Sequence, residues 1–437
     1  MASIPMDKSE SRDPLTGLYD LQEARETITA WKRDWPRDAS VCPIHAMLIS
    51  LGRIDNVNVA FGESAGDGAL VEAAQRIRHF AEDELESSVW FAARLNGGNF
   101  LLAIREECSR ERWQWLGEAL ADALASPFAN TSGGASVRMW PRVALMRVNE
   151  NDDSASVLDR LSEVVTRMRQ ENVRRIDWSS HTPEQTMRSS HELEADLLAA
   201  IDNDEIEIRY QPLFSLPANR LAGGEALARW HHPTVGRIGA STLFQIAERA
   251  DHVAHLSRHI AERAMEGARD WPSDLKLSLN ITSADLSVEN FAVDFARLAE
   301  RIGFPMGQIA LEITEQALVP DLERVAQVLD QLRMMGARIA LDDFGAGFCN
   351  FSYLKVLPLD CIKLDRTMID GVIDDPRDQA IFRAITGVAK ALDLCVIVEG
   401  IETEAQRDFC AAERCEFYQG FLTARPLLAD DFRKLAG

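Results

Sequence analysis

Eight short β-type segments recur through the second half of this 437-residue sequence, and helical stretches separate most of them. The segments are residues 206–214, 221–227, 275–281, 309–314, 338–343, 361–365, 395–400 and 416–421. Eight strands with intervening helices over about 250 residues are typical of a (β/α)₈ barrel. The sequence therefore predicts an α/β fold whose second part is a TIM-like barrel.

Polar side chains stand where these segments end, which is the edge of a barrel that carries active sites. One segment runs into the adjacent acids Asp342 and Asp343 and then into a loop with Gly345 and Gly347. A solvated strand end would explain one such pair of acids, but polar side chains stand at the ends of most of the predicted strands. The polar residues in or near the strand ends are Glu225, Asn280, Glu312, Asp342, Asp343, Lys363, Asp365, Glu399 and Gln419.

So many acids at one edge of a barrel need a counter-charge. Two carboxylates in close contact repel by about 4 kcal/mol at an effective dielectric constant near 20. Carboxylate and amide ligands without paired Cys or His favour two hard divalent cations, Mg²⁺ or Mn²⁺, with Ca²⁺ as a non-productive occupant. Two-metal sites suit in-line displacement at phosphate. The pattern thus indicates metal-assisted chemistry on a phosphate ester.

Charge and cysteine usage limit the other classes. The net charge of −22 argues against non-specific binding to nucleic acid or anionic membranes. The N-terminus has no apolar signal core, and no apolar run approaches the ~20 residues of a membrane span. The seven cysteines are scattered and odd in number, and Cys361 and Cys395 lie in apolar runs. We therefore expect a cytoplasmic protein with free thiols, no disulfide and no zinc.

The first part of the chain predicts a separate α+β domain. Helical patterns cover residues 21–31, 69–80, 112–124 and 155–169, and β-type patterns cover 46–51, 89–93, 100–104 and part of 137–148. The turn Asn96-Gly97-Gly98 is typical of a β-hairpin. Residues 1–12 are expected to be a flexible start, 13–172 the first domain, 173–190 a polar linker and 191–437 the barrel.

Three motifs make the first domain similar to the GGDEF domain of diguanylate cyclases. They are Asp13-Pro-Leu-Thr-Gly-Leu18, Gly66-Asp67 and Arg94-Leu-Asn-Gly-Gly-Asn-Phe100. That family holds two divalent ions with carboxylates against the phosphates of GTP. Here Gly98 and Asn99 replace the acidic pair of the signature, and Ser50 stands at the first metal-binding aspartate.

The resemblance therefore implies a degenerate GGDEF-like domain without cyclase activity, in a regulatory or dimerising role. The stretch before the turn also lacks an Arg-x-x-Asp product-inhibition site. Asn58 and Asp67 match positions that contact guanine in the family, so GTP binding to this domain stays open.

The second part strongly resembles the EAL family, in family order from about residue 190 to the end. The motifs are Glu225-Ala-Leu-Ala-Arg229, Asn280, Leu311-Glu-Ile-Thr-Glu315, Asp342-Asp-Phe-Gly345, Ile362-Lys-Leu-Asp-Arg366, Glu399-Gly-Ile-Glu402 and Gln419-Gly-Phe-Leu-Thr-Ala-Arg-Pro426. EAL domains are barrels with one strand running against the rest, and they hydrolyse cyclic di-GMP to linear pGpG. The resemblance implies a cyclic-di-GMP-specific phosphodiesterase that forms a homodimer in bacterial second-messenger signalling.

Carried over position by position, the resemblance implies a metal set, a catalytic set and a substrate set. The metal ligands would be Glu225, Asn280, Glu312, Asp342, Asp343 and Glu399, with Asp342 bridging the two ions. The catalytic set would be Lys363, Glu399, Gln419 and Glu315. Lys363 would orient or deprotonate the attacking water, and Glu315 would order the glycine loop. Gln211, Leu227 and Arg229 match positions that hold the substrate.

One departure leaves alternatives open. The loop reads Gly345-Ala-Gly-Phe-Cys-Asn350, without the usual threonine between the glycines, which puts rate and regulation in question. A receptor or scaffold that binds cyclic di-GMP without hydrolysis is the first alternative. A barrel glycosidase is the second, but its acid and nucleophile account for only two carboxylates and leave Lys363 and Asn280 without a role.

Overall fold

The computed structural model describes residues 11–35, 42–52, 54, 57–58, 62–85, 89–106, 108–126, 139–149, 151–171, 175–179, 190–233, 236–314, 322–345 and 353–436. The chain divides into two compact units. Unit 1 comprises Met1–Ser189 with His232–Thr242, and unit 2 comprises Ser190–His231 with Leu243–Gly437. Among the described residues, no helix has both the length and the apolar character needed to cross a membrane.

Unit 1 is built on a five-stranded sheet in the order β2-β3-β1-β4-β5. Its strands are β1 (Ile44–Gly52), β2 (Trp90–Asn96), β3 (Asn99–Arg105), β4 (Trp140–Arg147) and β5 (Ile176–Trp178). The central strand β1 is buried in eight of its nine residues because helices cover both faces of the sheet. The sheet confirms the predicted hairpin, in which Gly97 takes a positive φ of 50°.

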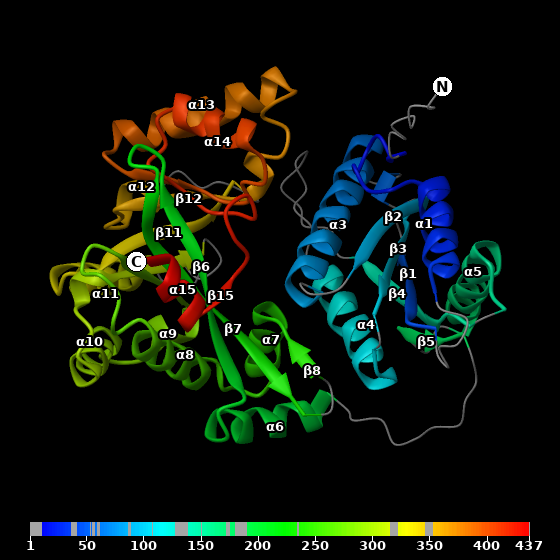
Figure 1. Ribbon diagram of the computed structural model, residues 1–437, viewed down its shortest axis with the longest axis horizontal. Coiled ribbons are helices and arrows are strands. Elements are labelled where there is room, and N and C mark those ends of the chain that lie inside the picture. Colours follow the sequence, from blue (N-terminus) through cyan, green and yellow to red (C-terminus); the bar gives the residue numbers. More distant parts are fainter. Residues whose placement is uncertain are drawn as a thin grey trace, which may run out of the picture. The chain divides into compact units, whose positions relative to one another are not determined.

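Helices form the outer layers of unit 1, and those with described bounds lie at the positions that the sequence predicts. They are α1 (Leu21–Arg33), α3 (Glu63–Glu84), α4 (Arg110–Ala125) and α5 (Ser154–Glu171). Helices α1 and α5 pack on one face of the sheet, and α3 and α4 on the other (Figure 1). Strand β5 was not predicted. It pairs in parallel with β4, so the first sheet extends into the stretch that the sequence assigns to the linker.

Unit 2 contains the eight-stranded barrel, and each predicted strand is present. The strands are β6 (Ile206–Ser215), β7 (Arg220–His232), β9 (Lys276–Ile281), β10 (Ile309–Thr314), β11 (Arg338–Phe344), β12 (Cys361–Leu364), β13 (Cys395–Val398) and β14 (Phe417–Tyr418). Their order is β6-β14-β13-β12-β11-β10-β9-β7, and β6 pairs with β7 to close the barrel. Strand β6 is antiparallel to both neighbours, whereas the others run in parallel. The prediction of one reversed strand is confirmed.

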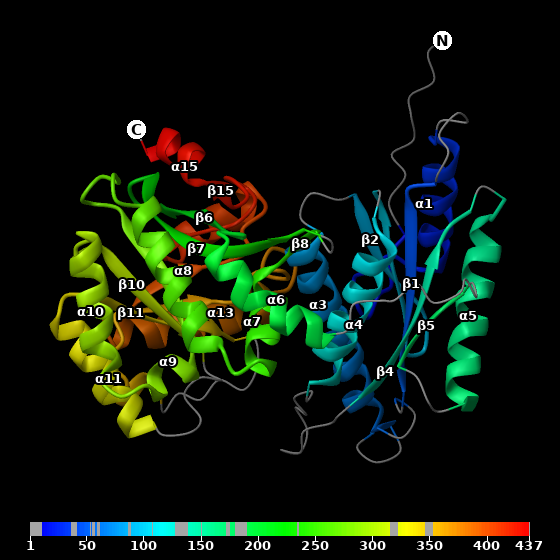
Figure 2. The same ribbon diagram turned by 90° about the horizontal axis from the view of Figure 1, so that it is seen from below.

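Helices surround this barrel, as the views from two sides show (Figures 1 and 2). They are α6 (Ser190–Asp202), α7 (Ala240–Arg249), α8 (Val253–Gly267), α9 (Ser283–Ser287), α10 (Phe291–Ile302), α11 (Leu322–Met334), α12 (Tyr353–Val356), α13 (Pro376–Ala391), α14 (Glu404–Ala412) and α15 (Ala429–Ala436). Local signals fix their ends: Asp375 caps α13 before Pro376, and Gly303 ends α10 in a left-handed conformation. The other short elements are β8 (Gly236–Ile238), which lies in the segment assigned to unit 1, and, in unit 2, β15 (Leu427–Leu428) and the 3₁₀ turns η1 (Met306–Gln308) and η3 (Arg366–Met368).

A small apolar cluster fills part of the barrel interior. We call it the barrel floor, and it consists of Leu213, Ala340, Cys361 and Ile397 with Cys395 and Phe417 packed against it. Each of these residues is two or four positions from a predicted site residue that lies on the same strand or follows directly after it. Because side chains alternate along a strand, the floor and the predicted site share the inner face of the barrel.

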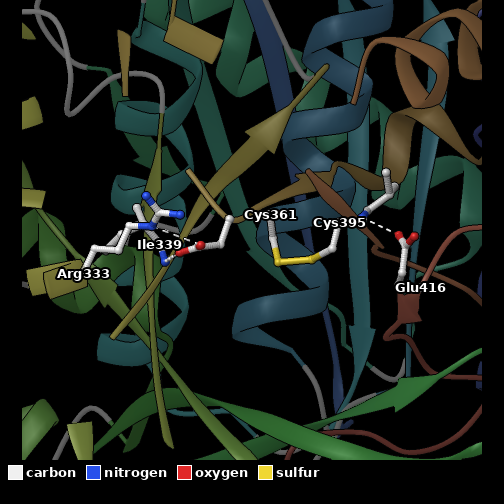
Figure 3. Close-up of a disulfide and its surroundings, with 7 residues drawn as sticks. Arg333, Ile339, Cys361, Cys395 and Glu416 are labelled. Atoms are coloured by element: carbon white, nitrogen blue, oxygen red, sulfur yellow. Dashed lines mark hydrogen bonds and ion pairs between the residues drawn. A yellow bond between two sulfur atoms is a disulfide. The ribbon is translucent and has the colours of Figure 1, made fainter. Parts of the chain in front are cut away.

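The prediction that Cys361 and Cys395 are free thiols is wrong, because the structure joins them in a disulfide (Figure 3). The two residues are register partners on the adjacent strands β12 and β13, and their Cα atoms are 4.4 Å apart. That distance lies within the range that disulfides span. The residues are 34 positions apart in the sequence, and strand register is not visible there. Cys42, Cys108, Cys410 and Cys415 are free thiols.

Candidate active site

Lys363 lies at the centre of the carboxylate cluster inside the barrel. It is the third residue of β12, and only 1% of it is exposed. Its Nζ atom is 2.5 Å from Glu312 Oε2, 2.7 Å from Glu399 Oε1, 3.1 Å from Asp342 Oδ1 and 3.3 Å from Glu225 Oε2. The acids come from β7, β10 and β11 and from the residue that follows β13. The closed barrel therefore brings together side chains that are far apart in the sequence.

Two amides support Glu225, one from the adjacent strand β9 and one from the residue that follows β14. Gln419 Nε2 donates to Glu225 Oε2 at 2.8 Å and to Glu399 Oε1 at 3.0 Å. Asn280 Nδ2 donates to Glu225 Oε1 at 2.9 Å. Because Asn280 uses its nitrogen for this contact, its side-chain oxygen is the atom that can ligate a cation.

The end of β11 turns two consecutive acids in different directions. Asp342 is buried, whereas Asp343 is exposed and takes a positive φ of 55°. The backbone N–H of Asp343 donates to Asp342 Oδ1 at 2.9 Å, and the pairing of β11 with β12 shifts between Leu341 and Phe344. Aspartate tolerates the left-handed conformation better than most residues. The irregularity therefore lets both carboxyls reach the same region instead of opposite faces of the sheet.

Among the described residues, the cluster contains five carboxyl groups and only one lysine in contact with them, and this excess of acids shifts their pKa values. Burial, with the charges of Glu225 and Asp342, raises the pKa of Glu312 to about 8. Burial also raises the pKa of Glu399 well above its ordinary value. The surrounding carboxylates overcome burial and raise the pKa of Lys363. Burial disfavours the charged form of Glu225, but Lys363 and the amides outweigh it, so the pKa of Glu225 is lowered.

The residues present fit two divalent cations. Glu225, Glu312 and Asp342 form one group of carboxylates, and Asp342, Asp343 and Glu399 form a second. In each group the oxygen atoms lie within 4.8 Å of one another, and Asp342 belongs to both. Mg²⁺ and Mn²⁺ prefer hard oxygen ligands, and a group of carboxylates supplies both such oxygens and negative charge. Burial and the neighbouring carboxylates raise the pKa values of Glu312 and Glu399, and a bound cation would favour the charged form of both acids.

The predicted substrate residues lie along β6 and β7. Glu225, Leu227 and Arg229 alternate on one face of β7, and Gln211 is the register partner of Glu225 on β6. Gln211 Nε2 donates to the carbonyl of Ala424 at 2.7 Å. Arg229 is buried, with 4% exposed, and Leu227 is half-buried. The structure thus places Gln211 beside the carboxylate cluster and extends the row of side chains from Glu225 toward the end of β7. Glu315 lies outside the described residues.

Asp365 belongs to this site, although its only predicted property was its place at a strand end. It is buried, and its carboxylate accepts hydrogen bonds from Thr367 N at 2.9 Å and Thr367 Oγ1 at 2.6 Å. Asp343 is exposed as a residue, but the surrounding groups desolvate its carboxyl group, and this desolvation, with the charges of Asp342 and Asp365, raises the pKa of Asp343 to about 7. The alternation of Lys363 and Asp365 on one strand was the signal that could have assigned it.

The metal-free protein is expected to lose stability as the pH rises from about 4.5 to about 8. Glu312 has a folded-state pKa of about 8 against an ordinary value of 4.5, so the folded state binds the extra proton in this window. The free energy of unfolding then falls with rising pH, by up to about 1.4 kcal/mol per pH unit from this group. Urea denaturation in EDTA at several pH values measures the slope.

Glu312→Gln is expected to flatten that slope, since glutamine does not titrate. Glu262→Gln serves as the control because Glu262 pairs with Arg301 on an outer helix, at 2.7 Å. Equal slopes in the parent protein and Glu312→Gln would contradict the assignment of the titration to Glu312.

A cavity lies in unit 1, at the position of the GGDEF signature. Its volume is about 660 Å³, and its lining residues are Leu51, Gly52, Ile54, Asn96, Gly97, Gly98, Asn99, Trp140, Arg142 and Arg169. Ser50 pairs with Asn99 and with Arg142 on the flanking strands, and its hydroxyl accepts a hydrogen bond from Arg169. Among these described lining residues there is no carboxylate, so they offer no ligand set for a divalent ion.

Comparison with protein families matches residues 194–426 to the EAL domain, which is more than half of the chain. The chain belongs to the EAL domain family. Residues 10–175 match the GGDEF domain of diguanylate cyclases, so this is a GGDEF–EAL two-domain protein. The resemblance that the motifs predicted is confirmed for both parts of the chain.

Curated relatives span both domains. The chain is 28% identical over 425 residues to the cyclic di-GMP phosphodiesterase PA2567 of Pseudomonas aeruginosa, covering 96% of this chain and 70% of that protein. It is 28% identical to the cyclic di-GMP phosphodiesterase NbdA of the same organism, covering 95% of this chain and 52% of NbdA. Against an uncharacterized signaling protein of Caulobacter vibrioides the identity is 29%, with 96% of this chain and 51% of the relative covered. The chain thus spans about half the length of several curated relatives that it matches.

Solved structures support the barrel assignment. The PaMucR phosphodiesterase in complex with c-di-GMP matches with a TM-score of 0.52 and 31% identity, over 55% of this chain and 99% of that one. The EAL enzyme Bd1971, with cAMP and cyclic di-GMP bound, matches with a TM-score of 0.54 and 26% identity, over 69% of this chain and 82% of that one.

Proposed function

We propose that this protein hydrolyses cyclic di-GMP to linear pGpG in a reaction that depends on two divalent cations, as part of bacterial second-messenger signalling. The observation that carries the proposal is the convergence of five carboxylates, two amides and one lysine inside the EAL barrel. Relatives named as cyclic di-GMP phosphodiesterases and the PaMucR complex with c-di-GMP support the substrate.

In this proposal the two carboxylate groups hold the two cations. Glu225, Glu312 and Asp342, with the Asn280 oxygen, would hold one, and Asp342, Asp343 and Glu399 would hold the other. When bound, the ions supply Lewis-acid activation and stabilise negative charge that develops on the phosphate.

The remaining side chains act on water and substrate. The ammonium of Lys363 lies among the carboxylates, where it can orient the attacking water and exchange a proton with it. Gln419 holds Glu225 and Glu399 in place. Arg229 would bind a phosphate of the dinucleotide as a planar cation, and Gln211 and Leu227 would contact its other groups.

The test is formation of pGpG from cyclic di-GMP by the full chain. Turnover is expected with Mn²⁺ or Mg²⁺, is lost in EDTA, and returns when Mn²⁺ is added back in excess. Absence of pGpG with every metal would reject the proposal. Binding of cyclic di-GMP in EDTA without turnover in any metal would identify the non-hydrolysing receptor instead, and the altered loop at residues 345–350 would then be the first suspect.

For unit 1 we propose a regulatory role without cyclase activity, in which GTP binding changes the rate of the barrel. The side-chain oxygen of Asn58 is buried without a hydrogen-bond partner among the described residues, and it lies beside Gly66. Asp67 is exposed on α3. An unpartnered carbonyl next to an exposed acid offers the acceptors that a guanine edge requires.

A titration with GTP is expected to show binding and a change in the rate of pGpG formation. Asn58→Ala should lose both effects, because it removes the buried acceptor, while keeping the basal rate. GTP that neither binds nor alters the rate would remove this role. The homodimer expected from the family is also a proposal, and sedimentation of the full chain tests it.

A further inference from the structure

The Cys361–Cys395 disulfide, drawn in Figure 3, belongs to the barrel floor. Cys361 is the first residue of β12, and Cys395 is the first residue of β13. Lys363 follows Cys361 by two positions, and Glu399 follows Cys395 by four, so each cysteine shares the inner face of its strand with a site residue. The bond therefore links the starting ends of two strands whose other ends carry the cluster.

Strands β12 and β13 are short, so the disulfide and the site residues lie close together along each strand. Each has four residues, and Lys363 Nζ lies 2.7 Å from Glu399 Oε1 at the far end. Hydrogen bonds also connect the region of each strand start to a neighbouring strand (Figure 3). The carboxylate of Asp360 accepts from the backbone N–H of Ile339 at 2.9 Å, and that of Glu416 accepts from the N–H of Val396 at 2.7 Å.

The barrel floor is closely packed and leaves little space for two separate thiol groups. Cys361 is 6% exposed and contacts a cluster with Leu213, Ala340 and Ile397. Reduction replaces a covalent S–S bond by two protonated sulfurs that must separate to van der Waals contact. Interiors packed at near-crystalline density respond to such a change by moving neighbouring groups. Separation of the two sulfurs would displace the starts of β12 and β13, and Lys363 and Glu399 lie two and four residues further along the chain.

We propose that this disulfide is a redox modification site that sets the activity of the barrel, with the oxidised form active and the reduced form slow. The inference rests on the proposed phosphodiesterase function. Its chemistry is thiol–disulfide exchange with a dithiol reductant. Cys395 is half-buried whereas Cys361 is buried, so the reductant's thiolate attacks Cys395 Sγ.

The exchange balances in two steps. In the first, a bond forms between the reductant and Cys395, and the electron pair of the S–S bond leaves on Cys361 Sγ, which takes up a proton. In the second, the other thiolate of the reductant attacks the mixed disulfide and releases the Cys395 thiolate, which is also protonated. The reductant becomes a cyclic disulfide, and the protein gains two electrons and two protons.

The experiment compares the full chain before and after treatment with dithiothreitol. Alkylation in denaturant followed by mass spectrometry counts the thiols, and reduction is expected to add two, at Cys361 and Cys395. Three other measurements follow: kcat for pGpG formation with Mn²⁺, the melting temperature, and the rise in melting temperature that Mn²⁺ produces. Reduction is expected to lower kcat by about tenfold or more, since misplacing a reacting group by ~1 Å can cost up to ~100-fold. Reoxidation should restore the rate.

Two variants separate this site from general effects of thiols. Cys361→Ala/Cys395→Ala is expected to show the low rate with or without dithiothreitol. Cys410→Ala/Cys415→Ala is the matched control: it removes two other buried cysteines of unit 2 that are free thiols, and it should keep the response. Reversible reduction of the parent protein tests the proposal even if the first variant does not fold.

The outcomes are distinguishable. Two added thiols with unchanged kcat and an unchanged Mn²⁺-induced rise in melting temperature would overturn the redox proposal, as would free thiols at both positions before reduction. If neither form makes pGpG, the proposed function fails. The Mn²⁺-induced rise then decides the redox proposal alone: a smaller rise after reduction supports it, and an equal rise rejects it.

Discussion

Lys363→Met is expected to reduce pGpG formation by about a thousand-fold, within the range that loss of a positioned proton-transfer group produces. Methionine keeps much of the side-chain length but removes the ammonium that contacts Glu225, Glu312, Asp342 and Glu399. In the metal-free protein the same change is expected to cost about 3–5 kcal/mol of the free energy of unfolding, because it leaves buried acids without a counter-charge. Added Mn²⁺ should recover part of that stability but not the activity.

Lys434→Met is the matched control, because Lys434 is an exposed lysine of the same unit. Among the ion pairs of the described residues, its partner is Asp431. It should retain the parent rate and stability. Steady-state kinetics and urea denaturation, each with and without Mn²⁺, provide the measurements. A Lys363→Met protein that retains activity within tenfold of the parent would show that the lysine serves only to neutralise the acids.

Glu225→Gln is the second change with a large expected effect. Glu225 accepts hydrogen bonds from Asn280, Gln419 and Lys363, so its carboxylate is surrounded by donors. Glutamine has nearly the same shape, but its NH₂ group would face one of those donors and its charge is gone. The affinity for Mn²⁺ is expected to fall by more than ~100-fold, beyond the effect of about 10–100-fold that outer-shell partners of metal ligands have.

The Mn²⁺-induced rise in melting temperature and the Mn²⁺ dependence of pGpG formation measure this effect. The rise should be lost in Glu225→Gln and kept in Glu262→Gln, whose side chain pairs with Arg301 outside the barrel interior. A Glu225→Gln protein with the parent's Mn²⁺ dependence would place the cations elsewhere. The two substitutions are therefore complementary: one tests the lysine with the acids intact, and the other tests the acids with the lysine intact.

The sequence by itself determined the barrel and the identity of the polar residues inside it. Strands such as 309–314 and 338–343 are short, apolar and separated by helical patterns, so their hydrophobic period predicts them without knowledge of their neighbours. The motifs around Glu225 and Lys363 likewise fix which residues stand at the strand ends. These properties are local, and a local pattern is readable from a single chain.

Only the tertiary structure decided which side chains meet. The pairing of Cys361 with Cys395 depends on the register of β12 against β13, and strand β5 depends on a parallel partner from 30 or more positions earlier in the chain. The position of Lys363 among four acids depends on closure of β6 against β7. Register and closure follow from packing free energies summed over the whole barrel. These free energies cannot be read from any short segment. The sequence therefore identified the residues of the site, and the tertiary structure determined which of them are in contact.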